Sequence, residues 1–260
     1  MLCCTDDETR PCLSYGTAGP VVLNDGQRRR AGIDSGSTIA WMSAHTPIPK
    51  TVEQTGDLPL LVFTPDSWGT MVLSDPMALL NDHAHLEKKA ASNALELLLR
   101  WPEPNPPENW VKAMTSIAKD EIEHLALVTR LLSRRGGKLG KSHTNSYAAE
   151  LRRMVRTGRG EDDTIDRLIV AALIEARSCE RFEILSRMCS DEELARVYSG
   201  LWVSERSHFR IFLDLAEKVS TWQGADSVEP RWQEMLAEEA RIIQEQPASP
   251  TMHSWNHLSS

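Results

Sequence analysis

The chain has 260 residues, of which 41% are hydrophobic, and its formal net charge is −8 at pH 7. This length suits one domain with a substantial core, and the negative balance argues against a protein that binds polyanions over its whole surface. The five cysteines are scattered, odd in number and form no Cys-x-x-Cys pair. They therefore exclude a disulfide framework and a thiolate zinc site, and they favour a reducing compartment.

The first 57 residues mix Gly, Pro, Ser, Thr and charged residues without a helical or strand period, so we expect a poorly ordered N-terminal extension there. No basic stretch leads into an apolar run, and the early run Leu58–Phe63, interrupted by Pro59, is too short to span a bilayer. We expect a cytoplasmic protein without membrane association. Its main domain should cover 58–246, and 247–260 should form a C-terminal tail.

From residue 74 onward the chain shows helix signals and almost no strand-like alternation, which predicts an all-α fold. Ser74 and Asp75 precede Pro76, a typical helix start. The segment WPEPNPP and the later Gly136-Gly137 pair are typical helix stops. The predicted helices cover 76–100, 107–133, 147–156 and 162–188, then run from a capping-box sequence at 190–193 to about 219, and finally cover 230–244.

Two of these helices contain a Glu-x-x-His motif, Glu121 to His124 and Glu205 to His208. Positions three apart share a helix face, so each motif offers one carboxylate and one imidazole to the same point. One copy alone is a weak signal, because such pairs occur by chance in many helical proteins. Both copies, however, lie inside the apolar stripes of their helices. Because an unpartnered buried carboxylate is costly, carboxylates on two core faces imply either bound cations or buried ion pairs.

The two remaining long helices each supply one further carboxylate on the core face. On the first it is Glu87, and on the third it is Glu175. The rival on the third helix is Glu180, which lies five residues on and about 140° round the helix. It shares that side with Arg177 and Arg187, so Glu175 is preferred.

Turn positions provide a geometric check on these choices. In an antiparallel hairpin, residues equidistant from the turn face each other. The midpoint of Glu87 and Glu121 falls inside WPEPNPP, and the midpoint of Glu175 and Glu205 is Ser190, the predicted cap. Each pair should therefore lie level across its hairpin, with the long stretch between the hairpins as the crossover of a ferritin-like bundle.

One Glu from each of two helices and one Glu-x-x-His from each of the others is the ligand set of di-iron and di-manganese carboxylate proteins. These donors suit Fe(II) and Mn(II), whereas the lack of clustered cysteines argues against an iron–sulfur cluster. A bundle held by buried salt bridges is the alternative, but its core stripes lack enough cations. We thus predict a ferritin-like four-helix bundle with a long crossover between its hairpins and an extra C-terminal helix. The predicted metal ligands, which are also the catalytic residues, are Glu87, Glu121, His124, Glu175, Glu205 and His208.

Two neighbours of this set have weaker signals. Asp120 could orient a ligand histidine through a hydrogen bond, although an exposed helix Asp is an equally good interpretation. His83 lies one turn before Glu87 and is expected as a core histidine next to the ligands rather than as a seventh ligand.

The crossover is basic in an otherwise acidic chain. Between Arg130 and Arg159 there are nine Lys or Arg and one acidic residue, Glu150. A merely solvated surface would carry mixed signs, so this segment favours binding to a polyanion. The candidate residues are Arg134, Arg135, Lys138, Lys141, Arg152, Arg153 and Arg156.

Several strings resemble the tRNA-(2-methylthio-N6-isopentenyladenosine) hydroxylases over roughly 58–253. The resemblance implies an O2-dependent monooxygenase with two iron ions, which hydroxylates the isopentenyl group of a modified adenosine beside the tRNA anticodon. It implies the same six ligands and a tRNA-binding role for the basic crossover. The strings are LLNDHAHLEKKAASNALELL, KAMTSIAKDEIEHLALV, YAAELRRMVR, LIVAALIEARSCERFEIL and SERSHFRIFLDLA.

Other functions fit the same ligand set. The chain has no NAD or flavin fingerprint, so an oxygenase of this kind needs electrons from a separate reductase or ferredoxin. One alternative is a di-iron oxygenase that acts on a small molecule or a protein and does not need the basic crossover. Another is a non-oxygenase iron-binding bundle, for storage or structure.

Overall fold

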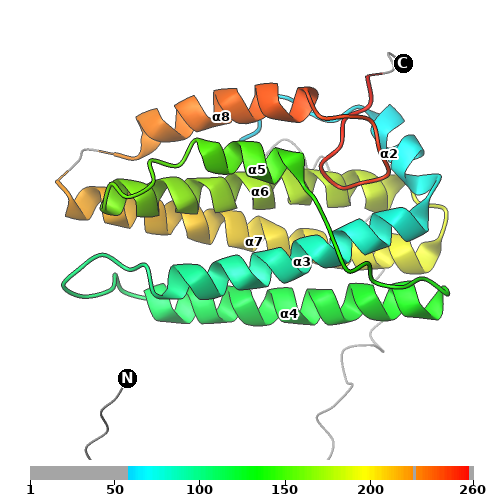
Figure 1. The fold of residues 1–260 in the computed structure, drawn as a ribbon, viewed down its shortest axis with the longest axis horizontal. Helices are drawn as coiled ribbons and strands as arrows, with labels where there is room; N and C mark the ends of the chain where they lie inside the picture. Colours follow the sequence, from blue (N-terminus) through cyan, green and yellow to red (C-terminus); the bar gives the residue numbers. More distant parts are fainter. Residues whose placement is uncertain (1–57, 225–226, 258–260) are drawn as a thin grey trace, which may run out of the picture. The chain divides into compact units, whose positions relative to one another are not determined.

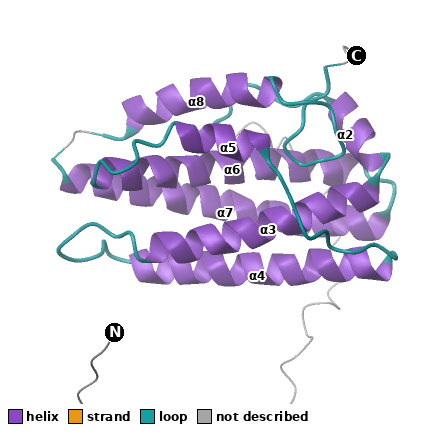
Figure 2. Ribbon diagram, viewed as in Figure 1, coloured by secondary structure: helices purple, strands orange, loops and turns teal. Residues whose placement is uncertain are grey.

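A computed structural model describes residues 58–224 and 227–257, and the extension expected at 1–57 lies outside the described residues. The described part is helical without strands, which confirms the predicted all-α class (Figures 1 and 2). In this part no helix is long and apolar enough to cross a membrane. The helices are α2 (Asp66–Leu73), α3 (Pro76–Leu98), α4 (Trp110–Arg134), α5 (Ser146–Arg153), α6 (Glu161–Met188), α7 (Glu192–Trp222) and α8 (Glu229–Gln244).

Two antiparallel hairpins form the four-helix bundle (Figure 1). The first pairs α3 with α4 and the second pairs α6 with α7, and both pairs pack along their length. The connection from α4 to α6 contains α5 and is the predicted crossover. Helices α5 and α8 contact each other and α6, so they cover the outer side of the second hairpin.

Capping residues explain where the long helices begin. Asp75 accepts a hydrogen bond from the backbone N–H of Ala78 at the start of α3, as its position before Pro76 predicts. At the start of α7 the cap is Asp191, not the predicted Ser190, and it accepts from the N–H of Leu194 at 3.0 Å. Helix α4 begins three residues later than predicted, because Asn109 adopts a left-handed backbone conformation (φ 67°).

Sequence patterns missed the short helix α2. It begins after Pro65 and has no side-chain cap hydrogen bond. Its Trp68 is fully buried and donates from its indole N–H to the Ser254 hydroxyl at 3.0 Å. The part of the expected C-terminal tail that is described is therefore packed against the domain. Its Met252 is also fully buried and donates its backbone N–H to Asp82 on α3 at 2.8 Å.

A buried ionic network joins α5, α6 and α8 behind the bundle. The Arg177 guanidinium donates two hydrogen bonds of 2.9 Å to Glu239 and one of 2.6 Å to Glu180. The Tyr147 hydroxyl donates to the same Glu239 carboxylate at 2.9 Å. All four side chains are at most 1% exposed. Removing one partner would leave an uncompensated buried charge, so this network fixes how α6 packs.

We expect Glu239→Ala to lower the free energy of unfolding by about 3–5 kcal/mol, because Arg177 would lose its bidentate partner in the interior. The matched control is Glu238→Ala, which removes an exposed pair with Arg241 and should cost less than about 1 kcal/mol. Urea denaturation of both variants measures the difference. Equal losses would show that the network does not stabilise the fold.

Candidate metal centre

Four buried carboxylates meet in the middle of the bundle, one from each long helix. Glu87 comes from α3, Glu121 from α4, Glu175 from α6 and Glu205 from α7, and each is at most 6% exposed. The level positions across both hairpins follow from the turn midpoints. Because the hairpins are antiparallel and their turns centre on those midpoints, carboxylates distant in sequence come to one height.

Two histidines complete the cluster. Nδ1 of His124 lies 3.4 Å from a Glu205 oxygen and 3.6 Å from a Glu87 oxygen. Nδ1 of His208 lies 2.8 Å from a Glu121 oxygen and 3.4 Å from a Glu205 oxygen. The two imidazole rings are 6.2 Å apart between centroids. Each Glu-x-x-His motif therefore presents both its side chains to the same interior space.

The six side chains form two overlapping groups, and in each group the possible ligand atoms lie within 4.8 Å of one another. The first contains Glu87 and His124, and the second contains Glu175 and His208. Glu121 and Glu205 belong to both groups. Such an arrangement could hold two metal ions, with Glu87 and His124 available to one, Glu175 and His208 to the other, and Glu121 and Glu205 to both.

Four buried nitrogen and oxygen atoms of the cluster have no hydrogen-bond partner in the described part of the chain, as expected of atoms that bind metal ions. Nδ1 of His124 and of His208, with one oxygen each of Glu121 and Glu205, are buried without a hydrogen-bond partner among the described residues. His208 Nδ1 and Glu121 Oε1 are close, but their orientation is not that of a hydrogen bond. Buried polar atoms are normally satisfied, and these four point to the interior of a cluster that metal ions would fill.

The pKa values of the cluster show that its negative charge is not balanced by the protein's own cations. Burial and the neighbouring charges of Glu205 and Glu87 raise the pKa of Glu121 to about 8. Burial disfavours protonation of His124, but the surrounding carboxylates outweigh it and raise its pKa to about 12. Without metal, Glu121 and His124 therefore keep protons at neutral pH that a free glutamate or histidine side chain would mostly have lost. Metal binding requires deprotonated ligands, so bound ions would displace those protons.

His83 and Asp120 each lie beside one of these six residues. His83 Nε2 donates to Glu87 at 2.5 Å, and its ring stacks against Tyr198. Asp120 Oδ2 is 3.4 Å from His208 Nε2, the ring atom on the far side from the cluster. Both residues are placed to orient a possible ligand, and His83 belongs to neither metal-binding group.

Glu175 and Glu180 lie on different sides of α6. Glu175 belongs to the cluster, whereas Glu180 accepts hydrogen bonds from Thr64 and Arg177 in the network behind the bundle. The buried arginines of α6, Arg177 and Arg181, also lie on that side. Arg181 packs over the Trp68 ring at 4.0 Å and donates to the Ser254 carbonyl.

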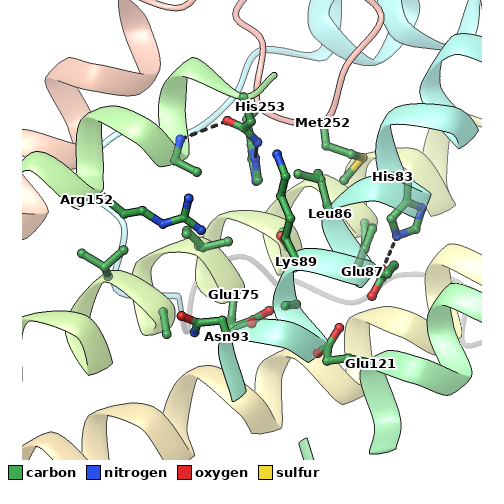
Figure 3. Close-up of a pocket in the computed structure, with 18 residues that line it drawn as sticks. His83, Leu86, Glu87, Lys89, Asn93, Glu121, Arg152, Glu175, Met252 and His253 are labelled. Atoms are coloured by element: carbon green, nitrogen blue, oxygen red, sulfur yellow. Dashed lines mark hydrogen bonds and ion pairs between the residues drawn. The ribbon is translucent and has the colours of Figure 1, made fainter. Parts of the chain in front are cut away.

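A pocket leads from the crossover to the carboxylates (Figure 3). Glu87, Glu121 and Glu175 in its lining are buried and form its inner end. Lys89 is half-buried and Arg152 is exposed, so these two residues lie on its solvent side, its mouth. Asn93, Asn145 and Ser178 also line the pocket, but the rest of its walls is largely apolar, formed by Leu86, Ala90, Val170, Ala171, Ile174 and Phe182. The pocket can thus hold an apolar group beside the cluster and a charged group at the mouth.

The basic crossover residues divide into two sets. Three are held by acidic side chains: Arg134 pairs with Glu193, Arg135 with Asp191 and Glu193, and Arg156 with Asp162 and Asp166. The other four are exposed and form no ion pair with a described residue. They are Lys138, Lys141, Arg152 and Arg153.

Comparison with known proteins gives the family. The model of the tRNA-(MS[2]IO[6]A)-hydroxylase (MiaE) family matches residues 56–254. The chain belongs to this family. It is 42% identical to a tRNA 2-(methylsulfanyl)-N(6)-isopentenyladenosine(37) hydroxylase of Pseudomonas putida, over 59% of this chain and 72% of the relative. A hydroxylase with the same description from Salmonella typhimurium is 30% identical, over 60% of this chain and 74% of the relative.

Among solved structures, the fold is similar to Protein 43 with aldehyde deformylating oxygenase activity from Synechococcus. The TM-score is 0.67 at 32% identity, and the match covers 76% of this chain and 96% of that one. The predicted ferritin-like bundle is confirmed for this MiaE-family chain, and the similar structure is itself an oxygenase.

Sequence reasoning predicted Arg152 but missed three other residues that line the pocket. Lys89 and Asn93 line it one turn apart on α3, and His253 comes from the C-terminal segment. A helical-face argument through Leu86, Lys89 and Asn93 could have found the first two, because these positions follow the spacing of one face. Nothing in the sequence pattern of 247–257 points to the pocket.

We expect Glu121→Ala and Glu205→Ala each to lose both metal ions, because each residue belongs to both ligand groups. Glu87→Ala should retain about one ion per chain, since the group of Glu175 and His208 stays complete. Metal analysis of each variant, after anaerobic loading with ferrous iron and desalting, gives the stoichiometry. Equal retention in all three variants would contradict the shared role of Glu121 and Glu205.

Proposed function

We propose that this protein is an O2-dependent di-iron monooxygenase that hydroxylates the isopentenyl group of 2-methylthio-N6-isopentenyladenosine in tRNA, beside the anticodon. The observation that carries the proposal is the pair of ligand groups sharing Glu121 and Glu205 at the inner end of an apolar pocket. Membership of the tRNA hydroxylase family and the names of both relatives support the substrate.

We propose iron at the cluster, held by Glu87, Glu121, His124, Glu175, Glu205 and His208. Carboxylate and imidazole donors suit iron and manganese, and this ligand set is that of the di-iron carboxylate proteins. When bound, the iron pair would supply the O2 chemistry that oxidises an aliphatic C–H bond. One oxygen atom enters that bond, and the other leaves as water with two electrons and two protons. The electrons would come from a separate reductase or ferredoxin.

The chain's own residues would position the reactants. Glu121 and Glu205 would hold both ions at one spacing, while hydrogen bonds from His83 to Glu87 and between His208 and Asp120 would fix the ligands. The apolar walls would bind the isopentenyl group and exclude bulk water from the reacting carbon.

For the tRNA itself, we propose that the exposed residues Lys138, Lys141, Arg152 and Arg153 bind phosphates. Arg134, Arg135 and Arg156 would contribute less, because carboxylates already neutralise them. Their ion pairs join the crossover to α6 and α7, so we assign them mainly to the fold.

The test is mass spectrometry of tRNA nucleosides after the iron-loaded protein has acted on tRNA that carries the isopentenyl modification, with O2 and a reductant. We expect one added oxygen on the isopentenyl group, and loss of at least about 100-fold in rate for Glu205→Ala, because both ligand groups would lose a carboxylate. The control Glu238→Ala changes only an exposed pair on α8 and should retain full rate. If the iron-loaded wild type adds no oxygen to the isopentenyl group, the proposal is overturned.

A small-molecule oxygenase is the second candidate, and the Synechococcus structure favours it, since that protein is described as acting on an aldehyde. The same iron-loaded protein can be given apolar aldehydes in place of tRNA. Turnover of an aldehyde without turnover of tRNA would select this alternative.

A further inference from the structure

The mouth of the pocket holds two cations that have no carboxylate at contact distance among the described residues. Figure 3 shows Lys89 of α3 and Arg152 of α5 in the pocket wall, away from Glu121 at the inner end. Arg152 forms no ion pair with a described residue, although most arginines of the described part are tied to Asp or Glu.

Lys89 is held in place by a chain of hydrogen bonds. Its ammonium donates to Nδ1 of His143 at 2.8 Å, and Nε2 of His143 donates to Asp82 at 2.6 Å. Asp82 is buried, and its other oxygen accepts the backbone N–H of Met252. The His143 ring stacks on His85 with centroids 4.8 Å apart. The lysine is therefore a fixed donor, and an ammonium with one N–H used has two more to offer.

This geometry matches an anion at the mouth. A bound phosphate oxygen would receive a lysine N–H and the planar guanidinium of Arg152, the usual partners of phosphate in proteins. Apolar side chains, among them Leu86, Ile174 and Phe182, line the same pocket as the carboxylates. A ligand with phosphate at one end and an apolar substituent at the other would satisfy both parts.

We propose that Lys89 and Arg152 form a phosphate clamp for the RNA strand at the target nucleotide, and that His143 and Asp82 are positioning residues for Lys89. This inference rests on the proposed function, and it states from which side the modified nucleotide enters the pocket. The clamp binds a phosphate next to the modified adenosine, while the isopentenyl group of that adenosine extends along the apolar wall towards Glu87 and Glu121. Lys89 lies outside the basic crossover, so net charge along the sequence does not reveal it.

The first test measures binding of an anticodon stem-loop RNA that carries the modified adenosine to the iron-loaded protein without O2, by fluorescence anisotropy. For Lys89→Met with Arg152→Met we expect Kd to rise about ten-fold near physiological salt. The slope of log Kd against log salt should fall by about 0.7, because both cations bind one phosphate and each single-strand phosphate contact contributes about 0.7. The matched control, Lys88→Met with Lys112→Met, removes the same charge from exposed positions outside the pocket. Equal changes in both double variants would overturn the clamp.

The second test separates positioning from packing. His143→Gln can keep the hydrogen bond to Asp82 while it removes the Nδ1 acceptor of Lys89. It should weaken RNA binding in the wild type and have no further effect in the Lys89→Met background, since its influence passes through Lys89. Additive losses would overturn the positioning role. Unchanged iron content and thermal unfolding show that the variants are folded.

Hydroxylation of the same RNA, run in parallel, separates this inference from the proposed function. If the wild type does not hydroxylate the RNA while its affinity for that RNA still depends on Lys89 and Arg152, the proposed function fails and the clamp stands. If the wild type hydroxylates the RNA and the clamp variant shows the KM of the control variant, the clamp fails and the function stands.

Discussion

The structure depends on one constraint, the burial of four carboxylates at a single height in the bundle. Burying one such charge alone costs several kcal/mol, and neighbouring carboxylates repel each other. His124 and His208 supply only part of the compensating charge, and the raised pKa of Glu121 is the consequence. The cluster is therefore an unfavourable way to stabilise a fold and a favourable way to hold two divalent cations. Matched hairpins are needed because only level positions let Glu121 and Glu205 belong to both ligand groups.

Helix α6 separates this charge from a second set of buried ions. On one side it presents Glu175 to the cluster, and on the other Arg177 and Glu180 to the network with Glu239. Every acid in that network has a buried cation, so the network is closed and has no capacity for a metal ion. The contrast distinguishes the two sites: carboxylates matched by arginines are structural, and carboxylates without them require ions from outside. The same network fixes the rotation of α6 and with it the direction of Glu175.

Local periodicity and turn positions were enough to predict the bundle, the level of the carboxylates and the preference for Glu175 over Glu180. They depend on helix geometry, which repeats regularly along the chain. The missed features depend on contacts between distant segments. Helix α2 has no cap signal, and Trp68 is buried only because Ser254 and its neighbours cover it. Asp191 rather than Ser190 caps α7, a choice between adjacent residues that a capping pattern does not resolve.

The charge of the crossover shows why counting along the sequence is insufficient for predicting a nucleic-acid surface. Arg134 and Arg135 are followed by glycines and basic residues, yet their acidic partners, Asp191 and Glu193, come from the start of α7. A run of positive residues thus loses part of its charge to a helix that is distant in sequence. Lys89 shows the reverse: it lies in an ordinary helical stretch, and only folding brings it to Arg152 and His143.

A protein with a net charge of −8 can still present positive potential to a polyanion, provided that its unpaired cations gather at one opening. What matters for recognition is which cations have no carboxylate partner after folding, and at this pocket they are Lys89 and Arg152, the residues of the proposed clamp.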